Sequence, residues 1–274
     1  MPRDPDMEAV GALMREVGRT AILPRFRALE AHEVMEKGVG DIVTAADLEA
    51  EHRLTETLSA MLPGSRVVGE EAHHEDPGID AHFDGDAPVW VIDPLDGTRN
   101  FSNGDETFCM LLALVDRQRT RRAWLYDPAK DRLAMAEEGA GATLNGAPLR
   151  TPPPPAESEM IGQINLGWFE KPARGAVKRA AEKRFGGLHR MFCAGHDFLQ
   201  QAQGLRHFSF YRWLRSWDHA PGVLIRREAG GIVERIDGGP YRAGDRSPGL
   251  LSAPDRQCWE ALKRFLEEAG PRQG

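Results

Sequence analysis

The stretch VWVIDPLDGTRNF, at residues 89–101, is the most informative part of this 274-residue sequence. Its first four residues are apolar and mostly β-branched or aromatic, which predicts a buried strand. The strand runs directly into Asp93, and a second acid, Asp96, follows across a tight turn. Two acids placed in this way can aim their carboxylates at one point. Hard oxygen ligands of this kind suit Mg²⁺, so the stretch indicates a divalent metal site.

A surface turn is the simplest alternative for this stretch, because Asp-Pro and Asp-Gly are both common turn formers. Two observations favour a ligand site. The acids follow an apolar strand, so they emerge from a core rather than from a loose loop. Gly97 and Thr98 are also expected to begin a helix, whose unpaired N–H groups can hold a phosphate.

A second apolar segment also ends on carboxylates. Val67 and Val68 run straight into Gly69-Glu70-Glu71. Both strands therefore deliver acids at their C-terminal ends, where α/β proteins commonly build ligand sites. This repeated arrangement strengthens the prediction of a carboxylate site.

Composition excludes several classes of function. The net charge of −7 at pH 7 argues against a broad surface for nucleic acids or anionic membranes. The three cysteines indicate a reduced compartment rather than a disulfide framework. No apolar run approaches the roughly 20 residues that span a bilayer, and the first residues form no apolar signal core. We therefore expect a cytoplasmic protein without nucleic-acid or membrane partners.

Hydrophobic periodicity predicts the elements of the first half. Helices are expected at residues 7–29 and 48–62, where apolar residues recur at helical spacing. Short apolar runs at residues 108–115, 123–126 and 133–137 are separated or followed by turn signals. These runs predict an antiparallel meander.

An unbroken proline run at residues 152–155 can enter neither a helix nor a central strand. We interpret it as the boundary between an N-terminal domain, residues 1–150, and a C-terminal domain, residues 151–274. In the second domain strands alternate with helices. Strands are predicted at residues 160–164, 192–194, 208–211, 232–235 and 250–252, and helices at residues 196–203, 219–229 and 255–269.

A cysteine-dependent phosphatase motif can be set aside on its context. Such enzymes need a cysteine, five residues and then an arginine, and Cys258 and Arg264 have this spacing. Both residues lie inside a predicted amphipathic helix, without the glycine-rich loop that would activate and expose the thiolate. This pair is therefore expected to be structural.

Four blocks of the sequence match one known pattern in order and separation. They are DIVTAAD at residues 41–47, GEE at 69–71, DPLDGTRNF at 93–101, and WD at 217–218 with AGG at 229–231. Together they resemble the inositol monophosphatase family of metal-dependent phosphatases, over nearly the whole chain. The family also contains fructose-1,6-bisphosphatases and phosphoadenosine nucleotidases.

The resemblance implies an α/β fold, a layered αβαβα sandwich. Its N-terminal half would be α+β and its C-terminal half α/β, with the metals between them. It also implies a homodimer. The cofactor would be Mg²⁺, with two or three ions per active site, and Mn²⁺ could substitute for it.

The resemblance also implies a ligand set. Glu70, Asp93 and the backbone carbonyl of Leu95 would bind a first Mg²⁺. Asp93, Asp96 and Asp218 would bind a second, with Asp93 bridging the two ions. Metal-bound water has a lowered pKa, and a second ion can stabilise the leaving alkoxide.

The catalytic group implied by the resemblance is Asp47, Thr98 and Glu70. Asp47 and Thr98 would orient the attacking water, since Asp47 can accept the hydrogen bond of the Thr98 hydroxyl. Gly97 and Thr98 would bind the phosphate. Lys37 would assist a further metal ion or the phosphate.

Helix capping is the alternative role for two of these acids. Asp47 precedes a predicted helix and could be its N-cap, a role that is compatible with orienting Thr98. Asp218 precedes the helix that contains Pro221 and could cap it. For Asp218 the matching block favours metal binding.

The activity implied is hydrolysis of a small phosphate monoester, most simply myo-inositol monophosphate or a related polyol or sugar phosphate. A fructose-1,6-bisphosphatase or a 3′(2′),5′-bisphosphate nucleotidase is the alternative on the same scaffold. An alternative of another class is a non-catalytic regulator that binds a phosphate ligand. Intact acids argue against a regulator, because carboxylates are costly to crowd together without metal.

The substrate-recognition region departs from the inositol phosphatases. Between Asp197 and Asp218 there is no acid, whereas many inositol phosphatases place one before the Trp-Asp block. Basic residues there either form a solvated edge or contact a second anionic group of the substrate, since guanidinium pairs well with phosphate. The candidate substrate-binding residues are Lys37, His196, Tyr211, Arg212 and Arg215, with Arg206 and His207 nearby.

Overall fold

The computed structural model describes residues 5–30, 33–38 and 41–270, and the side chains of 36–38 and 41 are outside this description. Residues 66–149 form a seven-stranded sheet in the order β3-β4-β5-β6-β7-β8-β9. Only β3 and β4 are parallel, and the later strands form the antiparallel meander that the sequence predicts. The strands are β3 (Arg66–Gly69), β4 (Val89–Asp96), β5 (Cys109–Asp116), β6 (Arg119–Asp127), β7 (Arg132–Glu137), β8 (Gly141–Leu144) and β9 (Ala147–Leu149).

A second sheet of five strands has the order β11-β10-β12-β14-β13. Its first three strands are parallel, and β14 runs antiparallel to both β12 and β13. The chain reaches it from β9 through the proline run. The strands are β10 (Ile161–Ile164), β11 (Gly187–Leu188), β12 (Phe208–Tyr211), β13 (Ile232–Arg235) and β14 (Leu250–Ala253), and a separate hairpin joins β1 (Val34–Gly38) to β2 (Asp41–Thr44).

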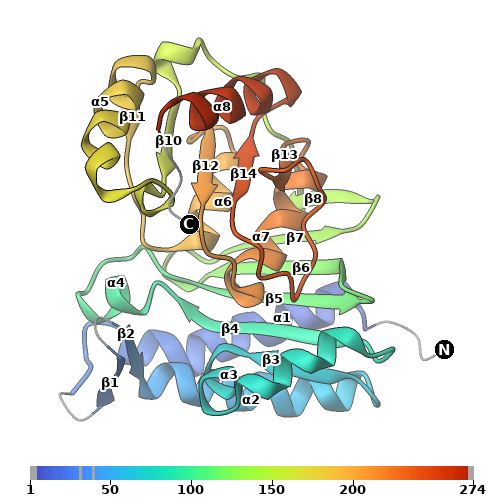
Figure 1. Ribbon diagram of the computed structural model, residues 1–274. Coiled ribbons are helices and arrows are strands. Elements are labelled where there is room, and N and C mark those ends of the chain that lie inside the picture. Colours follow the sequence, from blue (N-terminus) through green and yellow to red (C-terminus); the bar gives the residue numbers. More distant parts are fainter. Residues whose placement is uncertain (1–4, 31–32, 39–40, 271–274) are drawn as a thin grey trace.

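Helices cover the outer faces of the two sheets and fill the space between them (Figure 1). α1 (Met7–Val17) and α2 (Ala45–Met61) pack on one face of the seven-stranded sheet. α6 (Ala194–Ala202) and α7 (Ser216–Glu228) pack on its other face, below the second sheet. α5 (Arg174–Arg184) and α8 (Arg256–Glu268) cover the outer side of the five-stranded sheet. The result is the predicted layered αβαβα sandwich.

Strand β4 shows why this architecture buries the central stretch. Trp90 and Ile92 point toward α1 and α2, whereas Val89 and Val91 point toward α7, as the two-residue period of a strand requires. All four residues are buried. A strand with both faces covered must be apolar throughout, so the acids lie where the apolar run ends.

Several predicted boundaries are wrong, each for a local reason. The helix predicted at 7–29 ends at Val17 and continues as the π-helical turn Gly18–Ile22 and the 3₁₀ turn Leu23–Arg25. The strand predicted at 192–194 does not form. Phe192 has φ +56°, which no strand adopts, and Ala194 already begins α6.

Helix α5 and the short strand β11 are absent from the predicted elements. α5 buries only Val177 and Ala181 and is otherwise polar or charged, so its hydrophobic period is too weak to detect. The division into domains 1–150 and 151–274 stays a proposal, because α6 and α7 belong to the second half and pack on the first sheet. Among the described residues, no helix is both long and apolar enough to cross a membrane.

Candidate functional site

The site begins where β3 and β4 end side by side. These strands pair in parallel, with Gly69 opposite Ile92, so the residues that follow them emerge at the same edge. Glu70 starts α3 (Glu70–Glu75) directly after β3, and Asp93 follows Ile92 in β4. The pairing of β4 with β5 shifts register between Asp93 and Asp96. Adjacent parallel strands thus bring together acids that are distant in the sequence.

Asp93 lies at the centre of a group of five acids. It is buried, with 1% of its surface exposed. Burial raises its pKa well above the usual range, and the negative charges of Glu70, Asp96, Asp218 and Asp47 raise it further. Acids from four separate segments of the chain therefore act on one buried carboxylate, an arrangement that favours protonation or bound cations.

Asp47 links the start of α2 to Thr98. The N-cap of α2 is Thr44, and Asp47 is the third residue of the helix. Asp47 is therefore not the N-cap itself, but it forms a capping box with Thr44. One carboxylate oxygen accepts from the Thr44 N–H at 2.8 Å and from the Thr44 hydroxyl at 2.6 Å. The other accepts from the Thr98 hydroxyl at 3.1 Å. Burial raises the pKa of Asp47 to about 7.

Leu95 contributes its backbone to the same turn. Its N–H donates to the Asp93 carboxylate at 3.1 Å, and its carbonyl accepts from the Thr98 hydroxyl at 2.9 Å. The Leu95 side chain is fully buried. The turn thus fixes the Asp93 carboxylate and the Thr98 hydroxyl relative to each other.

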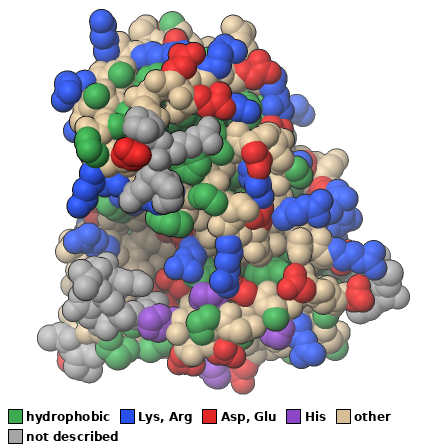
Figure 2. Space-filling view, viewed as in Figure 1, with side chains coloured by type: hydrophobic (Ala, Val, Ile, Leu, Met, Phe, Trp, Pro, Cys, Tyr) green, Lys and Arg blue, Asp and Glu red, His purple; other side chains and the backbone are tan. Residues whose placement is uncertain are grey.

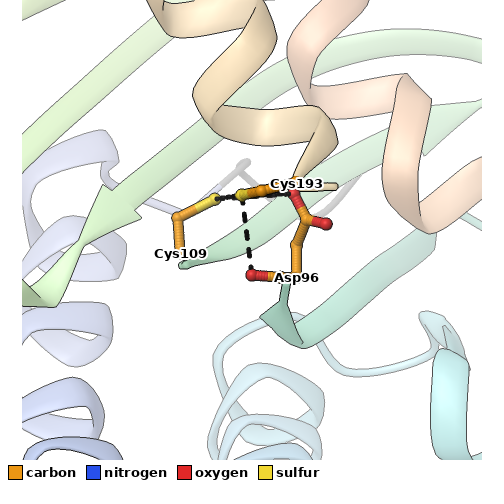
Figure 3. Close-up of side chains that lie close together, drawn as sticks. All are labelled: Asp96, Cys109 and Cys193. Carbon is orange, nitrogen blue, oxygen red and sulfur yellow. Dashed lines mark hydrogen bonds between the residues drawn. The ribbon is translucent and has the colours of Figure 1, made fainter. Parts of the chain in front are cut away.

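Asp96 is anchored from the opposite side by the start of α6 (Figure 3). Its Oδ2 accepts from the Gly195 N–H at 2.6 Å and lies 3.1 Å from the sulfur of Cys193. Cys109 Sγ lies 3.7 Å from both Asp96 Oδ2 and Cys193 Sγ. Burial raises the pKa of Cys109 to about 12, so both thiols are protonated donors around the carboxylate. These contacts hold Asp96 in a single orientation.

Gly97 allows the turn to close against the chain. Its φ is +88°, and a Cβ atom there would lie 2.7 Å from the Thr107 carbonyl oxygen and 3.2 Å from the Cys193 Cβ. The residue precedes α4 (Thr98–Ser102), whose first residue carries the hydroxyl described above. Only glycine therefore fits between the two acids and Thr98 without moving them.

Gly97→Ala should reduce stability by more than the roughly 1–2 kcal/mol expected from the backbone conformation, and it should lower phosphatase activity at least tenfold. The added Cβ meets a backbone oxygen, which cannot swing away as a side chain can. Gly64→Ala is the matched control, because Gly64 has the same φ of +88° but nothing within 4 Å. Denaturant unfolding and phosphate release measure both variants. Equal losses in the two variants would contradict this explanation.

Asp218 enters the site from α7, on the far side of the cluster. The N-cap of α7 is Arg215, so Asp218 occupies the first turn and the alternative role of Asp218 as the N-cap is excluded. The preceding Trp217 is buried and its ring lies 4.8 Å from the ring of His73 on α3. Pro221 lies within the first turns of the helix, which continues through it.

A cavity of about 790 Å³ opens beside this cluster, between the two sheets. Asp96, Thr98 and Asp218 line one end of it. Glu70 and Asp218 also line a neighbouring hollow of about 300 Å³. Glu70, Asp96 and Asp218 thus border open space, as a site for a small molecule requires.

The predicted substrate-binding residues have different positions. Tyr211 and Arg215 line the cavity, and the Tyr211 hydroxyl donates to buried Asp197. Arg212 donates to the Gly167 carbonyl and stacks on Trp213, 4.3 Å from the ring centre, and it is not among the lining residues. Lys37 lies on β1, but its side chain is outside the described part of the structure.

His196 was predicted to bind the substrate, but it does not line the cavity. It is buried, its Nε2 lies 3.0 Å from the Phe108 carbonyl oxygen, and burial lowers its pKa. Arg206 is also internal, where it pairs with Asp197 at 2.7 Å. Both side chains are buried in the protein interior and do not line the cavity.

Glu51 is a supporting residue that the sequence reasoning missed. Its carboxylate accepts from the N–H groups of Glu71 at 2.9 Å and Ala72 at 2.8 Å, which fixes the first turn of α3 behind Glu70. A signal was available, since Glu51 falls on the buried face of α2 with Ala50 and Leu54. A buried acid at an apolar position indicates a specific partner.

The fold matches that of solved structures. The IMPase of Thermotoga maritima aligns with a TM-score of 0.78 and 26% identity, covering 96% of this chain and 98% of that one. The architecture is therefore that of the inositol monophosphatase class.

Sequence comparison is more specific. The model of the inositol monophosphatase family matches residues 6–268. The Nus factor SuhB of Haemophilus influenzae is 32% identical over 250 residues, 89% of this chain and 90% of that protein. The inositol monophosphatase of Dictyostelium discoideum is 30% identical over 243 residues, 86% of each chain. The chain belongs to the inositol monophosphatase family, and it is a phosphoric monoester hydrolase of this metal-dependent class.

Proposed function

We propose that the protein hydrolyses a small phosphate monoester with Mg²⁺ held by the five-acid cluster. The observation that carries the proposal is the buried Asp93 carboxylate, whose pKa is raised by burial and by the negative charges of four other acids. Among the described residues, no lysine or arginine pairs with Asp47, Asp93 or Asp96. Divalent cations would remove the repulsion, and hard carboxylate oxygens are the ligands that Mg²⁺ prefers.

We propose that these donors hold two ions. Glu70, Asp93 and the Leu95 carbonyl would hold one, and Asp93, Asp96 and Asp218 would hold a second. Bound Mg²⁺ supplies an acidified water and neutralises charge on the phosphate and the leaving oxygen. The same proposal includes a third ion in the site and the substitution of Mn²⁺ for Mg²⁺.

Thr98 and Asp47 would position the water. The Thr98 hydroxyl donates to Asp47 or to the Leu95 carbonyl, so its oxygen lone pairs remain available to accept a proton from the water. Asp47 can take up the relayed proton at near-neutral pH, since its pKa is raised to about 7. The N–H groups at Gly97 and Thr98 would contact the phosphate.

The substrate that we propose is myo-inositol monophosphate or a related polyol or sugar phosphate. The relative from Dictyostelium discoideum, an inositol monophosphatase, supports this choice. A sugar bisphosphate or a 3′(2′),5′-bisphosphate nucleotide is the alternative within the same chemistry.

Phosphate release with and without chelation tests the proposal. We expect purified protein to release phosphate from at least one of inositol 1-phosphate, fructose 1,6-bisphosphate, histidinol phosphate and adenosine 3′,5′-bisphosphate in Mg²⁺. EDTA should abolish release, and added Mg²⁺ should restore it. Release that chelation leaves unchanged would contradict a metal-dependent mechanism.

A non-catalytic regulator that binds a phosphate ligand, the alternative of another class, does not fit a phosphoric monoester hydrolase. Such a regulator would bind phosphate ligands without turning them over in the same panel. We also propose that the protein is a homodimer, as the resemblance implies. Light scattering during size-exclusion chromatography measures the mass of the particle.

A further inference from the structure

Two thiols and one carboxylate converge beside the turn that holds Asp93. Asp96 at the end of β4 pairs with Cys109 at the start of β5, and Cys193 is the residue before α6. Figure 3 shows the three side chains pointing toward one another. Their ligand atoms all lie within 4.8 Å of one another, and both cysteines are buried. These three residues form a thiol–carboxylate triad.

The spacing of the triad is close to that of a tetrahedral zinc site. Zn²⁺ binds cysteine sulfur at about 2.3 Å and carboxylate oxygen at about 2.0–2.2 Å. In a tetrahedron these bonds place two sulfurs about 3.8 Å apart, and a sulfur and an oxygen about 3.5–3.7 Å apart. The two sulfurs of the triad are 3.7 Å apart, and Asp96 Oδ2 lies 3.7 Å from Cys109 Sγ and 3.1 Å from Cys193 Sγ. Two separations therefore match, and a small rotation of the Cys193 side chain corrects the third.

Apolar packing is the simplest alternative role for buried cysteines. Cys109 and Cys193 do lie in one apolar cluster with Leu111 and Leu199. Packing does not explain why both sulfurs approach the same charged oxygen of Asp96. Anchoring of the carboxylate explains it less well than metal binding does, because a thiol is a weak hydrogen-bond donor. Two soft ligands and one hard ligand at this spacing favour a thiophilic metal ion.

The triad borders the large cavity. Asp96 and Cys193 line this cavity of about 790 Å³, together with Thr98 and Arg99 of α4. Figure 2 shows a hollow on the left of the molecule, the side on which Figure 1 places α4. An ion can therefore approach two of the three ligands from the cavity.

Binding of Zn²⁺ leaves the net charge of the triad unchanged. With both thiols protonated, the triad carries only the negative charge of the Asp96 carboxylate. Zn²⁺ releases one proton from each thiol to water, because the thiolate is the form that binds the ion. Two thiolates and one carboxylate around a divalent cation again leave a single negative charge. The exchange therefore adds no net charge to a buried group, which would be costly.

We propose that Cys109, Cys193 and Asp96 form a binding site for Zn²⁺ that shares Asp96 with the proposed Mg²⁺ site. Sulfur ligands select Zn²⁺ over Mg²⁺, and three protein ligands leave the fourth position to water. Zn²⁺ on Asp96 draws on the negative charge that Mg²⁺ needs, so it should inhibit phosphate release. This inhibition rests on the proposed function, whereas binding of the ion does not.

Co²⁺ is the probe that tests the site without any turnover, because thiolate ligands give it a charge-transfer absorption band that oxygen ligands do not. With the cysteines reduced and Mg²⁺ in excess, one equivalent of Co²⁺ should produce the band, and Zn²⁺ should remove it. Cys109→Ser and Cys193→Ser should each weaken Co²⁺ binding at least about tenfold, since the loss of an outer-shell partner alone costs about that much. Cys258→Ser is the matched control, because Cys258 is the third cysteine and packs with α8 against the second sheet.

The absence of the band in the wild-type protein would overturn the site, even where a serine variant does not fold. A band that Cys258→Ser removes, or equal Co²⁺ binding in wild type and both other variants, would overturn it too.

Inhibition of phosphate release in saturating Mg²⁺ tests the link to activity. Half-inhibition should require at least about tenfold more Zn²⁺ in Cys109→Ser and Cys193→Ser than in wild type, and Cys258→Ser should match wild type. Equal inhibition of all four proteins would overturn this link and place the effect of Zn²⁺ in the five-acid cluster. A protein that hydrolyses no ester would refute the proposed function, and the Co²⁺ band would still decide the metal site.

Discussion

Asp93→Asn should reduce phosphate release by at least about a thousandfold, as removal of a central catalytic group does, while making the metal-free protein more stable. The loss follows because Asp93 would bridge both metal ions. The gain follows because the native carboxylate is buried among four other acids, which raise its pKa. An amide of the same shape keeps the hydrogen bond from the Leu95 N–H and removes one charge from the cluster.

Thermal unfolding in EDTA at about pH 8, together with phosphate release in Mg²⁺, measures both effects. We expect a higher Tm than wild type in EDTA and no rise in Tm on adding Mg²⁺. Asp86→Asn is the control, because its side chain is 97% exposed and lies outside the cluster. If the Asp93→Asn protein is less stable than wild type without metal, repulsion between the acids does not destabilise the folded protein.

Metal-free wild-type protein should lose stability as the pH rises from about 4 to about 8. Asp47 has an ordinary pKa of 3.8 and a folded pKa of about 7, so the folded state binds more protons between these values. The stabilising effect of the proton is complete below the lower value and is lost as the pH passes the higher one. Asp47 alone accounts for a few kcal/mol, a large part of the usual stability of a domain.

Mg²⁺ should reverse this dependence, because it binds the deprotonated cluster and competes with protons. The rise in Tm on adding Mg²⁺ should therefore be small near pH 5 and largest near pH 8. Differential scanning calorimetry across this range, with Mg²⁺ or with EDTA, gives both curves. The Asp93→Asn variant should show shallower slopes. Metal-free stability that increases with pH would contradict the raised pKa values.

The sequence was sufficient to predict the acid cluster because its members follow recognisable local features. Asp93 follows a fully apolar strand and Glu70 follows another, and parallel pairing of these strands explains their meeting. Asp218 required the resemblance, since local pattern alone suggested a cap. The structure shows these acids around one carboxylate, and their metal-binding roles remain predictions.

The wall of the cavity was less predictable. Arg190 lies after a helix with almost no hydrophobic period and just before residues 192–194, which were predicted to be a strand. His196 was expected in the pocket, but the first turn of α6 directs it to the Phe108 carbonyl. Such orientations depend on which side of a helix faces a neighbouring sheet, and a short helix with buried residues on several sides does not reveal that in sequence.

The double role of Asp47 links folding to chemistry in this enzyme. The same carboxylate closes the N-terminal turn of α2 and orients the Thr98 hydroxyl. If that end of α2 frays, the Thr98 hydroxyl loses its hydrogen bond to Asp47 at the same time. Partly unfolded molecules would therefore be inert toward phosphate esters, and activity would report the intact packing of the first layer.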